Sequence, residues 1–273
     1  MPAASILARG GVYPLRRETF FALFFGALIV GAWLALWYWN ASPYRRYVGH
    51  SGLLEPGALL AFCRALPQGE IVVPALLHAI GWVLMIAAMM LPTTYPLLGM
   101  FRNVARGRTD QTRLTLLVVA GFFVAWFAFG IAAHVADVAL ARSAEQFPSL
   151  AINGWIVGAA VLAAAGFFQF SALKYRCLEQ CRTPFAFVVS RWHGRAPARE
   201  AFRIGLDHGV FCVGCCWALM LCMFVVGTAS IGWMLALAAL MAAEKNLPGG
   251  TRLRLPVGLG LLAVASATVL ARI

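Results

Sequence analysis

Residues 205–223 read GLDHGVFCVGCCWALMLCM, a long apolar run that is unusually rich in thiols. Four of the seven cysteines lie between positions 212 and 222, and a histidine precedes them. Because a helix turns about 100° per residue, a continuous helix would carry six sulfur or imidazole side chains on one face about 120° wide. These six are His208, Cys212, Cys215, Cys216, Cys222 and Met223.

Thiolate and imidazole groups are the ligands that Cu(I) and Zn(II) prefer. The spacing therefore predicts a soft-metal site at His208, Cys212, Cys215 and Cys216, with copper as the first choice of metal and zinc as the second. Buried Cys and Met can also serve as ordinary small or flexible core residues, so packing alone stays open as the alternative.

A second thiol pair precedes this stretch. Cys177 and Cys181 are four residues apart, so they share a face if the chain is helical there. We expect them at the same end of the bundle as Cys212, where they would complete a metal site built from two helix ends. Two unrelated cysteines are the alternative.

Weaker candidates lie in an earlier apolar segment. His78, Met85 and Met89 fall on one helix face, and an ionisable group within a membrane span usually faces the bundle interior. A methionine stripe is more often packing than a ligand set. We therefore predict at most a secondary role in metal passage for these three residues.

The composition predicts that membrane helices surround these motifs. Apolar residues make up 62% of the 273 residues and charged residues 12%, whereas soluble domains have about 45–50% and about 25%. We predict an all-α, polytopic transmembrane bundle that forms one domain over residues 1–273. Seven spans are expected at about 20–39, 71–91, 114–140, 150–173, 209–226, 230–247 and 256–271. A six-span variant, in which 209–243 is one span with a re-entrant turn, stays open.

Two prolines and the basic residues refine this picture. Pro92 and Pro96 should end or kink the second span. Most Lys and Arg residues fall in the N-terminal tail and in the segments 100–113, 174–208 and 244–255, all on one side of a seven-span bundle. The positive-inside rule then places the N-terminus and the thiols on the cytoplasmic side, where thiols stay reduced. Lys245 is expected to extend toward the interface.

The same pattern argues against other classes of protein. The net charge of +12 is spread in short runs between apolar segments, which favours membrane orientation over nucleic-acid binding. The sequence has neither a GxxxxGK[ST] phosphate loop nor an HExxH motif, and no Ser/His/Asp set is suggested by spacing. No catalytic residue is assigned, and enzymatic activity is not the expectation.

Four segments occur in an order that resembles a known family. They are MIAAMMLP at 85–92, QFSALKYRCLEQCRTP at 169–184, GLDHGVFCVGCCWALM at 205–220 and EKNLPGG at 244–250. Together they resemble the DUF2182 family, described as predicted metal-binding bacterial integral membrane proteins, over about residues 70–271. The resemblance implies metal binding and a bacterial cytoplasmic membrane. The family tends to read YQLTPLK where residues 168–174 read FQFSALK, so a local proline kink is missing.

Three functions are compatible with these observations. The first is copper(I) binding, delivery or homeostasis through the Cys/His/Met site. The second is a membrane thiol–disulfide redox enzyme that uses Cys215 with Cys216, or Cys177 with Cys181. The third is an accessory structural subunit of a larger membrane complex. The expected partners are the lipid bilayer, other membrane subunits, or a protein that donates or accepts the metal.

Overall fold

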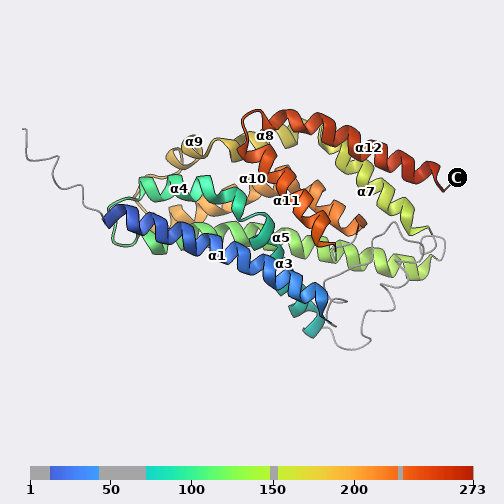
Figure 1. The fold of residues 1–273 in the computed structure, drawn as a ribbon, viewed down its shortest axis with the longest axis horizontal. Helices are drawn as coiled ribbons and strands as arrows, with labels where there is room; N and C mark the ends of the chain where they lie inside the picture. The colour runs from blue at the N-terminus through green and yellow to red at the C-terminus, as the bar shows by residue number, and fades with distance from the viewer. Residues whose placement is uncertain (1–12, 43–71, 148–152, 227–229, 273) are drawn as a thin grey trace, which may run out of the picture.

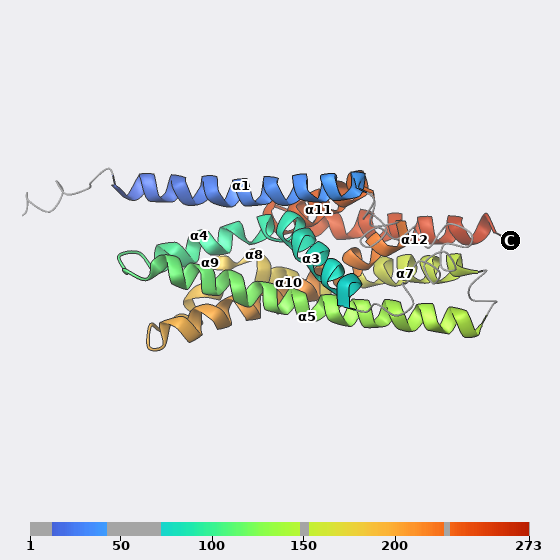
Figure 2. The same ribbon diagram turned by 90° about the horizontal axis from the view of Figure 1, so that it is seen from below.

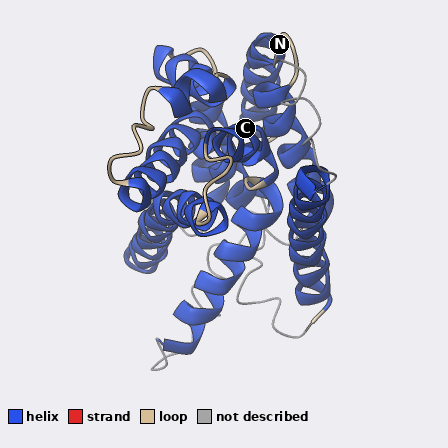
Figure 3. Cartoon of the chain, turned by 90° about the vertical axis from the view of Figure 1, so that its left-hand side faces the viewer, coloured by secondary structure: helices blue, strands red, loops and turns tan. Residues whose placement is uncertain are grey.

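The computed structural model describes residues 13–42, 72–147, 153–226 and 230–272, and every regular element within them is helical (Figures 1 and 3). The elements are α1 (Tyr13–Ala41), α3 (Val72–Met89), η2 (Pro92–Thr94), α4 (Tyr95–Val104), α5 (Gln111–Gln146), α7 (Gly154–Phe168), α8 (Ala172–Arg182), α9 (Pro184–Val189), α10 (Pro197–Val226), α11 (Ile231–Asn246), η3 (Gly250–Leu253) and α12 (Arg254–Leu270). The all-α prediction is therefore confirmed for the described residues.

Several of these helices are apolar enough to cross a membrane. Length and composition qualify four helices of the described chain, or up to six if each of two bent helix pairs counts as one span. Each of the seven predicted ranges overlaps a helix, but α11 and the two bent pairs fall short of an unbroken span by themselves. These helices could cross a membrane, as expected for a membrane protein, while the number seven and the cytoplasmic N-terminus stay predictions.

Two bends interrupt predicted spans. The helix that ends at Met89 resumes at Pro92 with a bend of 46°, as expected from the prolines. A sharper bend of 65° separates α7 from α8. There the Ser171 side chain accepts a hydrogen bond from the backbone N–H of Lys174 at 3.1 Å and starts α8. The span predicted over 150–173 is thus shorter, and Cys177 and Cys181 lie on a helix of their own.

The basic segment 174–208, which lies between two predicted spans, is mostly helical. It contains α8, α9 and the first turns of α10, which begins at Pro197, well before the predicted position 209. The Glu200 carboxylate accepts backbone N–H groups from all four residues of 193–196, at 2.7–3.2 Å, and so anchors this helix start. Hydropathy missed these turns because their outward-facing residues are charged.

Helix α10 lies at the centre of the bundle, between α5 on one side and α8 and α11 on the other (Figures 1 and 2). Its most extensive contact is with α5, and two glycines allow that close approach. A Cβ atom at Gly205 would lie 1.9 Å from the carbonyl oxygen of Val118, and one at Gly121 would lie 2.2 Å from that of Phe202. The thiol-bearing stretch of α10 therefore packs closely against α5.

Candidate metal centre

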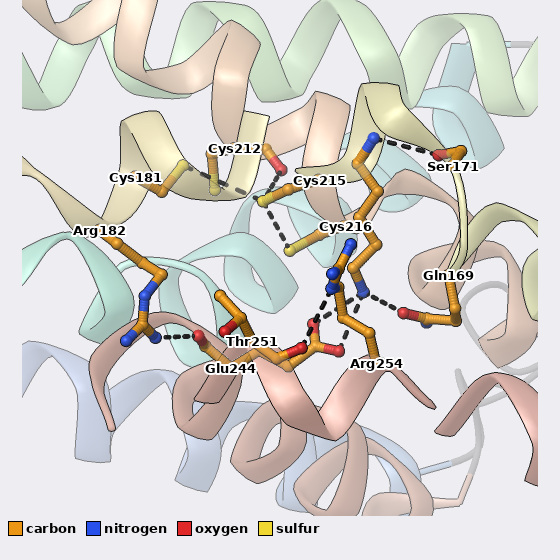
Figure 4. Close-up of polar contacts among 11 residues, drawn as sticks. Gln169, Ser171, Cys181, Arg182, Cys212, Cys215, Cys216, Glu244, Thr251 and Arg254 are labelled. Atoms are coloured by element: carbon orange, nitrogen blue, oxygen red, sulfur yellow. Dashed lines mark hydrogen bonds and ion pairs between the residues drawn. The ribbon is translucent and has the colours of Figure 1, made fainter. Parts of the chain in front are cut away.

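Four thiols from two helices form a continuous sulfur cluster, which we call the thiol centre: Cys181 of α8 and Cys212, Cys215 and Cys216 of α10 (Figure 4). The Sγ atom of Cys215 lies 3.3 Å from that of Cys216 and 4.0 Å from that of Cys181. Cys212 lies one helical turn before Cys216 on the same face of α10. The three α10 thiols are at most 1% exposed, so the cluster is dry on that side.

The helical spacing predicted from the sequence explains why the α10 thiols meet. Helix α10 is continuous from 197 to 226, so positions 212, 215 and 216 share a face. Cys215 also donates its S–H to the carbonyl oxygen of Cys212 at 3.2 Å. The sequence predicts that two helices bearing paired thiols come together, and α8 and α10 do so through Cys181 and Cys215. Cys181, however, lies on a short helix of its own rather than at the end of the preceding span.

Cys177 lies beside the thiol centre. Its side chain is buried, and a Cβ atom at Gly214 would lie 2.6 Å from its Sγ atom. The glycine thus makes room for the thiol between α8 and α10. No sulfur-to-sulfur contact of Cys177 is present among the described residues, whereas Cys181 has one.

Lys245 reaches into the thiol centre from α11. Its Nζ atom lies 2.9 Å from the Sγ atom of Cys212 and 3.3 Å from the hydroxyl of Thr93, and the residue is only 5% exposed. The expectation that Lys245 extends toward the interface is therefore wrong. The side chain turns inward because polar partners for its ammonium group are available inside the bundle.

A buried ion pair lies next to the thiol centre, and we call it the ion-pair network: Gln169, Lys174 and Glu244 (Figure 4). The Lys174 ammonium lies 2.8 and 3.0 Å from the two carboxylate oxygens of Glu244 and also donates to the side-chain oxygen of Gln169. Both charged residues are at most 1% exposed. The network joins the start of α8 to the end of α11 and so fixes the helix that carries Cys181.

Arg182 completes the link between α8 and α11. Its guanidinium donates to the backbone carbonyl of Glu244 and, at 2.8 Å, to that of Leu247. These carbonyls end α11, where the helix dipole is negative. The positive charge of Arg182 is therefore engaged by the helix end.

His208 is buried, but the structure does not bring it to the thiols. Its ring lies between Phe122, at a centroid distance of 6.0 Å, and Phe187, at 5.5 Å. Its Nδ1 atom is buried and has no hydrogen-bond partner among the described residues. An imidazole nitrogen in that state can accept a metal or a proton donor, so His208 stays a candidate one helical turn from Cys212.

The weaker candidates on α3 have a mixed outcome. Met85 and Met89 are buried in the same core cluster as the thiol centre, which fits packing as well as it fits metal passage. His78 lies on α3, but its side chain is outside the described residues. Their proposed part in metal handling stays a prediction.

The donor set of the thiol centre suits a soft metal ion. Thiolates select Cu(I) and Zn(II), and sulfur atoms 3.3–4.0 Å apart lie within reach of one ion at ordinary metal–sulfur distances of about 2.3 Å. Among the described residues, no group of three or more His, Cys, Asp or Glu side chains is already arranged around a common metal position. Binding by three or more ligands would therefore require side-chain movement.

The polar groups around the thiols were not assigned from sequence. Glu244 and Lys245 end a long apolar run, and charged residues in such a run commonly face the bundle interior. That signal was available for both residues. The pairing of Glu244 with Lys174 gives no such signal in the sequence, because the two residues are 70 positions apart and come together only in the folded chain.

Comparison with known proteins gives one match. A family model described as "PpoB2: Copper chaperone" matches residues 79–268, which is well over half of the chain and includes every described residue of the thiol centre. Neither the curated proteins nor the solved structures contain a match. The match supports a copper-related role, and the resemblance to the DUF2182 family stays a prediction.

Proposed function

The chain belongs to the PpoB2 copper chaperone family, and from this premise we propose that it binds Cu(I) inside the membrane and passes the ion to another protein. The cargo would be held by the thiol centre, and His208 and Cys177, which lie outside this centre, would serve at most as accessory ligands. Met85, Met89 and His78 would line the route of the ion. A partner protein that donates or accepts copper is part of this proposal.

The observation that carries the proposal is the meeting of Cys181 from α8 with Cys215 and Cys216 from α10, at Sγ–Sγ distances of 4.0 and 3.3 Å. Cysteines that serve only as small core residues have no need to cluster across two helices. Thiolates also bind Cu(I) in low coordination numbers, whereas Zn(II) takes four ligands in most protein sites. Zinc remains the second choice of metal.

Cu(I) titration of the purified protein in detergent, without oxygen and against a chromogenic Cu(I) chelator, tests this proposal. The wild-type protein should withdraw about one Cu(I) per chain from the chelator. The Cys212→Ala/Cys215→Ala/Cys216→Ala variant should withdraw none, because soft metal sites depend on their thiolates.

Cys222→Ala is the matched control. Cys222 lies on the same helix and is fully buried, but its S–H donates to the carbonyl oxygen of Ala218, and it has no sulfur-to-sulfur contact among the described residues. This variant should bind copper as the wild type does. Equal copper withdrawal by the wild type and the triple variant would contradict the proposal.

The redox alternative has a geometric difficulty at one of its two pairs. Cys215 and Cys216 are consecutive, so their Cα atoms are about 3.8 Å apart, and disulfides usually need about 4.4–6.8 Å. Oxidation of this pair would distort α10. Thiol trapping under oxidising and reducing conditions separates the two functions, because a copper site keeps its thiols free when the metal is removed.

A further inference from the structure

The charges buried around the thiol centre do not cancel. Two ammonium groups, of Lys174 and Lys245, face one carboxylate, that of Glu244. Lys174 is engaged by this carboxylate at 2.8 Å, and Arg182 is engaged by the end of α11. Among the described residues around the thiol centre, this leaves the positive charge of Lys245, which has a thiol and a hydroxyl as its hydrogen-bond partners.

A buried ammonium group is costly unless an opposite charge lies close to it. The Glu244 carboxylate is within electrostatic range of Lys245 but already pairs with Lys174. The groups near Lys245 that have no such partner are the thiols, with Cys212 in direct contact and Cys216, Cys215 and Cys181 within electrostatic range. A positive charge placed against a cluster of soft ligands is the arrangement expected for a site that receives a negatively charged metal complex.

Resting on the function proposed above, we propose that Lys245 is a specificity-determining residue that balances a Cu(I) ion held by two thiolates, one of which is Cys212. Cu(I) with two thiolates carries one negative charge, which the ammonium group neutralises. Each of the two thiols that bind the ion releases its proton to the solvent, and the copper stays in its +1 state throughout.

Two complexes that use more thiolates from the same four thiols do not balance. Cu(I) with three thiolates carries two negative charges, and Zn(II) with four thiolates also carries two. Either complex would leave one negative charge uncompensated inside the bundle, where an unpaired charge is strongly unfavourable. The single ammonium group of Lys245 therefore favours two-coordinate Cu(I) over Cu(I) with three thiolates and over Zn(II) with four thiolates at these thiols.

Two-coordinate binding also suits delivery. A Cu(I) ion with two ligands keeps coordination positions open for a sulfur ligand of an incoming protein. Exchange can then proceed by adding the new ligand before an old one leaves. Lys245 would act through charge alone, since its ammonium group has no lone pair to offer the metal.

The test compares Lys245→Met, which keeps the length and apolar stem of the side chain, with Lys245→Arg, which keeps the charge. Both are titrated with Cu(I) and separately with Zn(II) against chromogenic chelators, in detergent and without oxygen. Lys245→Met should bind Cu(I) at least about thirtyfold more weakly, because one partner of a buried charge pair is lost. Lys245→Arg should stay within about threefold of the wild type, and the preference for Cu(I) over Zn(II) should fall only in Lys245→Met.

X-ray absorption at the copper edge of the Cu(I)-loaded wild type gives a measurement that does not depend on how the variants fold. Two sulfur neighbours are expected, and three or four would overturn the inference. Unchanged Cu(I) affinity in a folded Lys245→Met protein would overturn it as well. A wild-type protein that binds no Cu(I) would instead contradict the proposed function, so the two failures are distinguishable.

Discussion

Lys174 and Lys245 are both buried near the end of α11, yet their ammonium groups have different partners. Lys174 meets a carboxylate and an amide oxygen, so the ion-pair network is balanced within itself. Lys245 meets a thiol and a hydroxyl, so its charge is balanced only if a thiol becomes a thiolate. The difference separates a charge pair that holds helices together from a charge that can respond to a metal complex.

The largest effect on stability is expected at the ion-pair network. Glu244→Ala removes the carboxylate and leaves the Lys174 ammonium unpaired in a site with 0% exposure. Loss of one partner of a buried pair costs about 3–5 kcal/mol. Thermal unfolding in detergent, followed by tryptophan fluorescence, should show a large fall in Tm. A Tm within a degree or two of the wild type would mean that the two lysines do not differ as we describe.

A smaller effect is expected at the thiol that faces the second lysine. Cys212→Ala removes the closest partner of Lys245 but leaves the Thr93 hydroxyl in place. An unsatisfied buried polar group costs about 1–3 kcal/mol, so the Tm should fall less than in Glu244→Ala. The Cys222→Ala protein serves as the reference for loss of a buried thiol without a lysine partner. If Cys212→Ala lowered the Tm more than Glu244→Ala does, Lys245 rather than Lys174 would be the lysine that stabilises the fold.

Cys177 offers a finer test of where the thiol centre ends. Gly214→Ala would place a methyl group 2.6 Å from the Sγ atom of Cys177, so this side chain must move. Because Cys177 has no sulfur contact among the described residues, Cu(I) affinity should change by no more than a few-fold, at a stability cost of about 1–3 kcal/mol from overpacking. Gly232→Ala on α11, where a Cβ atom meets nothing within 4 Å, is the control. A complete loss of copper binding in Gly214→Ala would mean that Cys177 is one of the copper ligands of the thiol centre.

The smallest effect is expected at a partly exposed ion pair outside the membrane helices. Arg108 donates to the Asp110 carboxylate at 2.8 Å, and this hydrogen bond lowers the pKa of that carboxyl. A lowered pKa contributes stability above the ordinary carboxyl pKa and loses it as the pH falls. Exposed pairs are screened by water, so Asp110→Asn should leave the Tm at pH 7 nearly unchanged. A fall as large as that of Glu244→Ala would show that burial is not what distinguishes the pairs.

The sequence supported the fold class and the core of the site for clear physical reasons. Apolar runs of span length identify membrane helices, and a period of 3.6 residues places Cys212, Cys215 and Cys216 on one face once α10 is continuous. Proline chemistry located the bend after Met89. These features are local, and local patterns are visible without a fold.

The remaining features depend on contacts between distant residues. The break at Gln169 relies on the Ser171 cap and on packing rather than on proline, so the span there was expected to be longer. The charged first turns of α10 were read as loop because hydropathy records apolar content alone. The inward turn of Lys245 follows from the positions of Cys212 and Thr93, which belong to other elements of the bundle.

The metal content of the protein as purified from copper-supplemented cells tests the central claim most directly. Mass spectrometry of copper and zinc in the wild type and in the Cys212→Ala/Cys215→Ala/Cys216→Ala variant is the measurement. We predict copper near one per chain in the wild type, copper near background in the variant, and little zinc in either. Stoichiometric zinc in the wild type, or equal copper in the two proteins, would contradict it.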